Sequence, residues 1–291
     1  MSPSRELVTR LGLQIPNFTF PGVADPELFE TIAGIATSAE NNGFDSVWVM
    51  DHLYQIEMVG PKEDAMFEAY TLLGALAART RRASLGTMVS GVTYRNPALL
   101  AKIVTTLDVI SSGRAILGIG AAWNVDEHTG YGFDYPSDKE RLDRLEEALQ
   151  INRAMFTEEA PTFEGRHYRV QQVLNNPRPI RGGIPVLIGG SGEKRTLKLV
   201  AQYGDACNLF GDPDTVRHKI GVLERHCADV GRDPAEITKT ILMTVRDPSV
   251  AADQVSAYRA VGVDGVVVNM PNVADLTAVA KTGEALSAAL A

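Results

Sequence analysis

Eight short apolar runs alternate along the chain with eight stretches of helical periodicity, and this alternation restricts the fold more than any other feature. Apolar runs followed by helical patterns are typical of βα units, which pair their strands in parallel. The expected strands cover residues 11–15, 45–50, 83–89, 114–119, 185–189, 205–209, 238–245 and 264–269. The expected helices cover residues 26–42, 66–80, 97–112, 138–156, 193–203, 213–230, 249–261 and 273–290. Eight such units predict a closed (β/α)8 TIM barrel in preference to an open sheet.

The length of the chain agrees with a single barrel domain over residues 1–291, because barrels of about 250 residues are common. One segment departs from the regular spacing. Residues 157–184, between the fourth helix and the fifth strand, are rich in proline and glycine and contain the alternating run His167-Tyr168-Arg169-Val170. We expect this segment to form an inserted hairpin and a lid.

The composition excludes several classes of function. The chain is 45% apolar and 22% charged, with a formal net charge of -8 and scattered basic residues, so we expect no nucleic-acid partner. No run of 18 apolar residues is present, and residues 1–6 lack the apolar core of a signal peptide, which predicts a cytoplasmic protein without a membrane partner. Cys207 and Cys227 lie too far apart for a local metal motif, so we expect reduced thiols and no metal site.

Polar and glycine residues gather where the expected strands end, and a barrel brings these ends to one rim. Asp51 and His52 directly follow the run Val47-Trp48-Val49-Met50. Histidine exchanges protons near neutral pH, which makes His52 a candidate general acid or base. The alternative is structural: Asp51 would cap the next segment and His52 would pack against a loop.

A glycine-rich turn follows the fifth expected strand and resembles a phosphate-binding cradle. Gly189-Gly190-Ser191-Gly192 leads into an expected helix that begins Glu193-Lys194-Arg195-Thr196. Free backbone N–H groups, the positive end of a helix and two cations would then coincide. A tight turn without a ligand is the alternative interpretation.

Nearly the whole chain resembles the luciferase-like flavin and deazaflavin oxidoreductases, and within them the branch that uses coenzyme F420. The resemblance rests on four motifs: Gly43-Phe44-Asp45-Ser46-Val47-Trp48-Val49-Met50-Asp51-His52, Leu85-Gly86-Thr87 through Tyr94-Arg95-Asn96-Pro97, Ser112-Gly113-Arg114 through Gly118-Ile119-Gly120-Ala121-Ala122-Trp123-Asn124, and Ile188-Gly189-Gly190-Ser191-Gly192.

The resemblance implies a TIM barrel with an inserted segment and a tricyclic cofactor across the barrel mouth. It implies that Asp51 contacts the cofactor ring and that His52 faces the substrate. Relatives have a non-prolyl cis peptide behind the ring, and the matching place here is near Thr87-Met88, to within one residue. The implied reaction transfers a hydride between the deazaflavin C5 carbon and a small organic substrate, with His52 assisting proton transfer.

The candidate site therefore has a catalytic pair, a cofactor set and a substrate set. Asp51 and His52 form the catalytic pair. The cofactor-binding candidates are Asp51, Thr87, Met88, Ser90, Asn124, Gly189, Gly190, Ser191, Gly192, Lys194 and Arg195. The substrate-pocket candidates are Asn17, Trp123 and Glu127, although Glu127 is equally suited to bind a helix end or the inserted segment.

Two other functions are weighed against this one. The first is an FMN-dependent monooxygenase of the same fold, which would use dioxygen. The second is a cofactor-free phosphate-binding barrel isomerase, which would need a catalytic lysine or an acid/base pair at the strand ends. The expected partners are a small-molecule substrate and, as one option for assembly, a second copy of the chain in a homodimer.

Overall fold

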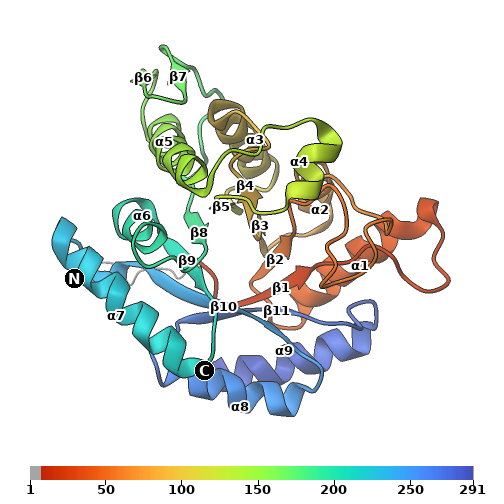
Figure 1. Ribbon diagram of the computed structural model, residues 1–291. Helices are drawn as coiled ribbons and strands as arrows, with labels where there is room; N and C mark the ends of the chain where they lie inside the picture. Colours follow the sequence, from red (N-terminus) through yellow and green to blue (C-terminus); the bar gives the residue numbers. More distant parts are fainter. Residues whose placement is uncertain (1–7, 291) are drawn as a thin grey trace.

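The computed structural model describes residues 8–290, and in it eight parallel strands close into a barrel (Figure 1). The barrel strands are β1 (Leu11–Ile15), β2 (Ser46–Val49), β3 (Ser84–Thr87), β5 (Ala115–Gly120), β8 (Val186–Gly189), β9 (Ala206–Leu209), β10 (Thr238–Thr244) and β11 (Gly265–Asn269). Leu11 of β1 lies opposite Val266 of β11, and Leu85 of β3 lies opposite Ala115 of β5. The predicted (β/α)8 barrel is therefore confirmed, including the pairing of the first and last strands.

Helices surround the barrel in the order that the sequence predicts (Figure 1). They are α1 (Leu28–Asn41), α2 (Ala69–Arg79), α3 (Pro97–Ile110), α5 (Asp138–Thr157), α6 (Thr196–Tyr203), α7 (Pro213–Val230), α8 (Pro248–Arg259) and α9 (Leu276–Leu290), with 3-10 turns at Asp25–Glu27 and Pro234–Glu236. Three helices begin three residues later than expected. For α2 the reason is its cap: the Glu68 side chain accepts a hydrogen bond from Thr71 N, and the helix begins after it.

One short helix was not expected from the sequence. Helix α4 (Val125–Tyr131) follows β5 and carries side chains of the candidate site. Asn124 caps it by accepting a hydrogen bond from Asp126 N, and Gly132 ends it with φ 70°. Seven residues are too few to show helical periodicity, which is why the pattern gave no sign of it.

The inserted segment forms a hairpin, as predicted, but not at the barrel mouth. Strands β6 (Phe163–Glu164) and β7 (Arg169–Val170) pair antiparallel and lie beside α5 (Figure 1). The Glu147 carboxylate of α5 accepts hydrogen bonds from the backbone N–H groups of Arg166, His167 and Tyr168. No residue of this hairpin lines the cavity at the strand ends, so in this structure α5 holds the expected lid open on its own surface.

The barrel interior has its own apolar cluster beneath the mouth. Trp48, Ile116, Leu187, Ala206 and Val267 are buried there and pack against Met88, Val89 and Leu242. The Trp48 indole N–H donates to Ser46 Oγ at 2.8 Å. A Cβ at Gly12 would lie 2.5 Å from Trp48 Nε1, so the glycine gives this large ring its space.

Both cysteines are free and buried. Burial raises the pKa of the Cys207 thiol to about 12. In residues 8–290 no helix combines the length and the apolar character needed to cross a membrane.

Candidate active site

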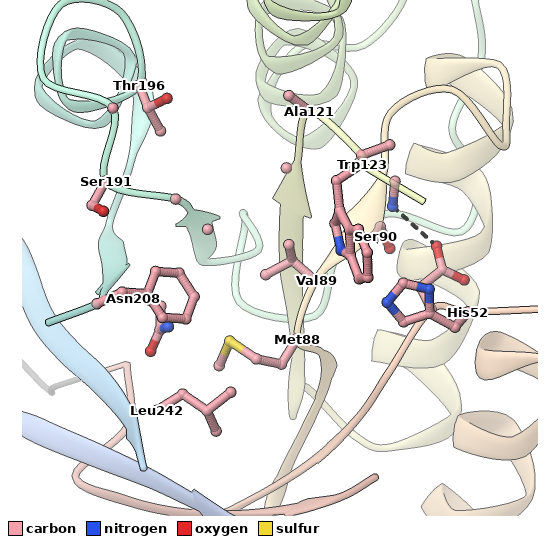
Figure 2. Close-up of a pocket in the computed structure, with 18 of the residues that line it drawn as sticks. His52, Met88, Val89, Ser90, Ala121, Trp123, Ser191, Thr196, Asn208 and Leu242 are labelled. Carbon is pink, nitrogen blue, oxygen red and sulfur yellow. Dashed lines mark hydrogen bonds between the residues drawn. The ribbon is translucent and has the colours of Figure 1, made fainter. Parts of the chain in front are cut away.

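A cavity of about 320 Å³ opens at the carboxyl ends of the barrel strands. Trp123 and His52 lie together on one side of it, and Ser191, Thr196 and Asn208 lie on the other (Figure 2). Residues 88–91 and 120–122 form the wall between these sides. The cavity therefore has a side with an ionisable imidazole and a side with glycine-turn and amide groups.

His52 is held by a buried carboxylate. Its Nδ1 lies 2.9 Å from Glu127 Oε2, and the His52 side chain is 15% exposed whereas that of Glu127 is 0% exposed. The Trp123 ring meets the His52 ring edge to face at 5.5 Å between centroids. The imidazole is therefore fixed on one side by α4 and on another by the segment after β5.

Glu127 collects four hydrogen bonds from the surrounding segments. Tyr54 N donates to Oε1 at 3.0 Å, Leu53 N donates to the same oxygen, and the Tyr94 hydroxyl donates to Oε2 at 2.7 Å. Burial alone would raise the pKa of Glu127, but the hydrogen bond and charge of His52, with these donors, hold it below its usual value. Glu127, a substrate-pocket candidate, is thus buried behind His52 and does not line the cavity.

Asp51 lines the cavity and is bound by Arg95. Its two oxygens accept from the Arg95 guanidinium at 2.7 and 2.9 Å, and Gly91 N donates at 3.3 Å. Arg95 also binds Glu68 at 2.6 Å and lies over the Tyr70 ring. Burial lowers the pKa of Arg95, but the Asp51 carboxylate outweighs it, so Arg95 stays charged. Burial raises the pKa of the Asp51 carboxyl, and the Arg95 guanidinium opposes that rise. Through these contacts Asp51 fixes the position of Gly91 and Arg95.

The wall between the two sides contains an unusual peptide bond. The bond between Met88 and Val89 is cis, within the one-residue range expected from the resemblance. Met88, Val89 and Ser90 all line the cavity. Ser90 Oγ lies 2.7 Å from the Tyr70 hydroxyl and 2.9 Å from Thr87 Oγ1. The Tyr70 and Thr87 hydroxyls therefore fix the orientation of the Ser90 side chain. Thr87, expected at the cofactor, does not line the cavity.

The glycine turn lies at the other side of the cavity, but the two cations expected beside it do not line that cavity. Gly189, Gly190, Ser191 and Gly192 line the cavity, and Gly190 has φ 112°, a conformation that favours glycine. Helix α6 begins at Thr196, which also lines the cavity. The turn therefore presents backbone groups and a hydroxyl toward the cavity.

Lys194 and Arg195 do not line this cavity. Arg195 donates to Asp143 Oδ1 at 2.6 Å and Glu146 Oε2 at 3.4 Å, both on α5. Lys194 is exposed beside α7, in a separate hollow with Arg225 and His226. The two cations expected at a phosphate therefore lie away from this cavity: α6 begins at Thr196, three residues later than predicted, and acidic residues of α5 bind Arg195.

Two asparagines also have structural places. Asn17 forms a local turn, in which its Oδ1 accepts from Thr19 N and its Nδ2 donates to Thr19 O. Asn124 caps α4 and faces a neighbouring cavity. Asn17 was expected at the substrate and Asn124 at the cofactor, and neither side chain lines the cavity beside His52.

Several cavity residues were missed from the sequence. Asn208 is 1% exposed, its Oδ1 accepts from Thr240 Oγ1 at 3.1 Å, and its Nδ2 has no hydrogen-bond partner in the described chain. A polar residue inside the buried run 205–209 was the available signal for it. Tyr94 and Thr196 lay within motifs already quoted. Phe210 and Leu242 carried no signal, because apolar residues at strand ends are ordinary core residues.

The fold and the site define a class: a (β/α)8-barrel protein with a cavity at the carboxyl ends of its strands. The family model of the luciferase-like monooxygenases matches residues 9–287, and the chain belongs to that family.

The chain is also similar to individual proteins. It is 36% identical over 193 residues to a Nakamurella multipartita protein named F420-dependent glucose-6-phosphate dehydrogenase. The aligned region covers 65% of this chain and 55% of that protein. The chain thus spans about half the length of the curated relatives that it matches first.

Two solved structures share the fold. One is an F420-dependent secondary alcohol dehydrogenase in complex with an F420-acetone adduct, with a TM-score of 0.79, 20% identity, and coverage of 97% of this chain and 99% of that one. The other is the coenzyme F420-dependent tetrahydromethanopterin reductase of Methanopyrus kandleri, with a TM-score of 0.78, 17% identity, and coverage of 95% and 97%.

Proposed function

We propose that this protein is a coenzyme F420-dependent oxidoreductase acting on a small organic substrate, with His52 assisting proton transfer. The observation that carries the proposal is the His52–Glu127 pair at the wall of a cavity that also holds a glycine turn. The names of the relatives support the same cofactor.

The residues present fit a phosphate-bearing tricyclic cofactor. The unpartnered Nδ2 of Asn208 is a buried donor at the cavity, and such a group is costly unless a ligand or water meets it. Gly190 N donates to Asn208 O at 3.4 Å, so the N–H groups of Ser191 and Gly192 are the donors that this turn offers to a phosphate. We infer that Asn208, Thr196 and the turn hold the cofactor and that Met88 and Val89 lie behind its ring.

A bound deazaflavin supplies or accepts a hydride at C5, and the chain must handle the accompanying proton. Glu127, with its lowered pKa, is an acceptor only, so His52 Nδ1 must carry the hydrogen between them. His52 Nε2 makes no hydrogen bond with a described residue and is left to face the substrate. It can donate a proton during reduction and accept one during oxidation.

Parallel titrations of the purified protein with F420 and FMN test this proposal. We expect saturable F420 binding, and FMN should fail to displace it at comparable concentration. Tighter FMN binding would assign the protein to the monooxygenase alternative instead. Absence of binding by either cofactor would refute both.

A further inference from the structure

A second cavity, of about 640 Å³, adjoins the first and shares one wall residue with it. Trp123 lines both cavities. Its side chain is 55% exposed, and its ring meets that of His52 at 5.5 Å. The second cavity lies between the segment after β2 and the beginning of α4. A molecule that reaches past Trp123 from His52 would therefore enter it.

The part of this second cavity's wall that residues 54–63 form is anchored although it contains neither helix nor strand. Gln55 is buried; its Nε2 donates to Pro16 O at 3.1 Å and its Oε1 accepts from Ile56 N at 2.9 Å. Glu127 binds the backbone of Leu53 and Tyr54 from beneath. The same carboxylate thus positions His52 and the beginning of this wall.

The size of the first cavity leaves little room for an extended substrate. A volume of about 320 Å³ is near the lower end for ligand cavities, which span roughly 300–1,000 Å³. A tricyclic cofactor would take up most of that space. Only the reacting end of a substrate can then remain beside His52, and a longer molecule must extend elsewhere.

The lining of the second cavity has apolar and acidic parts. Met58 and Val125 are 82% and 48% exposed, and with Trp123 they place exposed apolar side chains around one hollow. Exposed apolar side chains that gather around one hollow indicate a binding site, whereas single scattered ones are ordinary.

The charged lining residues are three carboxylates and one ammonium: Glu57, Glu63, Asp126 and Lys62. No ion pair joins any of the four to another described residue. The excess of negative charge favours a cation over an anion in the same place.

We propose that this cavity is the subsite for the distal part of an elongated substrate with an apolar chain and a cationic end. Trp123 separates that part from the reacting atoms and so limits which substrates reach His52. The inference rests on the proposed oxidoreductase function for the identity of the reacting end. It also distinguishes the chain from an enzyme of sugar phosphates, whose anionic end the carboxylates would repel.

Three probes of equal chain length test the subsite: hexylamine, 1-hexanol and hexanoate. Each is titrated by tryptophan fluorescence against the full chain, with and without F420. We expect hexylamine to bind about tenfold more tightly than hexanoate, since each exposed charge contributes only modestly, and added salt to reduce the difference. The change in fluorescence should disappear in Trp123→Phe, because the other tryptophan, Trp48, is buried and does not line the second cavity.

Two triple variants provide the decisive comparison. Glu57→Gln/Glu63→Gln/Asp126→Asn should reduce the preference for the amine to about twofold or less. The control Glu159→Gln/Glu224→Gln/Asp253→Asn removes the same charge from exposed residues that do not line this cavity and should retain the preference. Equal binding of amine and carboxylate, no binding of any probe, or a preference unchanged in the first triple would overturn the subsite. Failure of F420 to bind would instead refute the proposed function. The titrations of the three probes without F420 would still test the subsite.

Discussion

His52 and Glu127 form a hydrogen-bonded pair in which only the imidazole reaches the cavity. Glu127 is 0% exposed and lies behind His52, so its carboxylate does not line the cavity. Under the proposed function, Glu127 is a positioning residue and His52 is the catalytic residue. The sequence indicated His52 through its place after a strand. It could not indicate the partner, because Glu127 lies on a helix too short to show a pattern.

Substitutions at these two residues should separate their roles. His52→Ala should lower kcat by about 10² to 10⁴. Glu127→Gln should lower kcat by less, since the amide can still accept from His52 but without full charge. F420 affinity should change little in either, because neither side chain belongs to the glycine-turn side. Tyr94→Phe is the matched control, as it removes one hydrogen bond to Glu127 and keeps the ring; equal kcat in all four proteins would show that the pair only packs.

Asn208 and Arg195 give opposite expectations for cofactor binding. Asn208→Ala should weaken F420 binding about 3- to 10-fold, the loss of one hydrogen bond at a buried site. Arg195→Ala should change it by less than about twofold, because this guanidinium is engaged by Asp143 and Glu146. Equilibrium titration of both variants checks this. A large loss for Arg195→Ala with none for Asn208→Ala would restore the sequence-based assignment of the phosphate site.

At the scale of elements, strand ends were predictable and side-chain directions were not. The apolar runs placed all eight barrel strands to within about two residues, because buried parallel strands have strong continuous patterns. The direction of Arg195 depends on acidic residues of α5 more than 40 positions earlier in the chain, which no local pattern reports. The hairpin was predictable from its alternation, but its attachment to Glu147 was a tertiary contact.

The hairpin at residues 163–170 should behave as a part of the α5 surface and not as a lid. Glu147→Ala removes the acceptor of three backbone N–H groups and should speed hydrogen exchange at Arg166, His167 and Tyr168. F420 affinity should stay within about twofold of the wild type, since a lost contact of about 1.4 kcal/mol would already change it tenfold. A cofactor affinity that falls together with hairpin protection would place the hairpin over the cavity in solution.

For the whole molecule, the buried charges connect the site to stability. Glu127 has a pKa below its usual value in the folded chain. Such a carboxylate stabilises the fold fully above its unfolded pKa, about 4.3, and that contribution disappears as pH falls through the lower folded value.

Glu127→Gln should therefore lower the free energy of unfolding by about 1 to 3 kcal/mol at pH 7. The gap between wild type and variant should stay constant down to about pH 5 and narrow below about pH 4. Denaturant unfolding at several pH values measures it, with exposed Glu159→Gln as the control. A gap that widens on acidification has the opposite sign and would contradict the hydrogen-bonded carboxylate.

The proposed function assigns a hydride transfer with F420 and a proton transfer with His52 to the mouth of this barrel. The most direct measurement excludes oxygen and follows cofactor absorbance in both directions, with reduced F420 and a panel of carbonyl compounds, then oxidised F420 and the matching alcohols. Compounds with apolar chains and amine ends should be included. We expect F420 to interconvert between its oxidised and reduced forms without oxygen, at a rate that depends on the substrate. The rate in His52→Ala should be at least about 10²-fold lower than in the wild type. Turnover that requires FMN and consumes oxygen, while F420 remains unchanged with every compound, would contradict it.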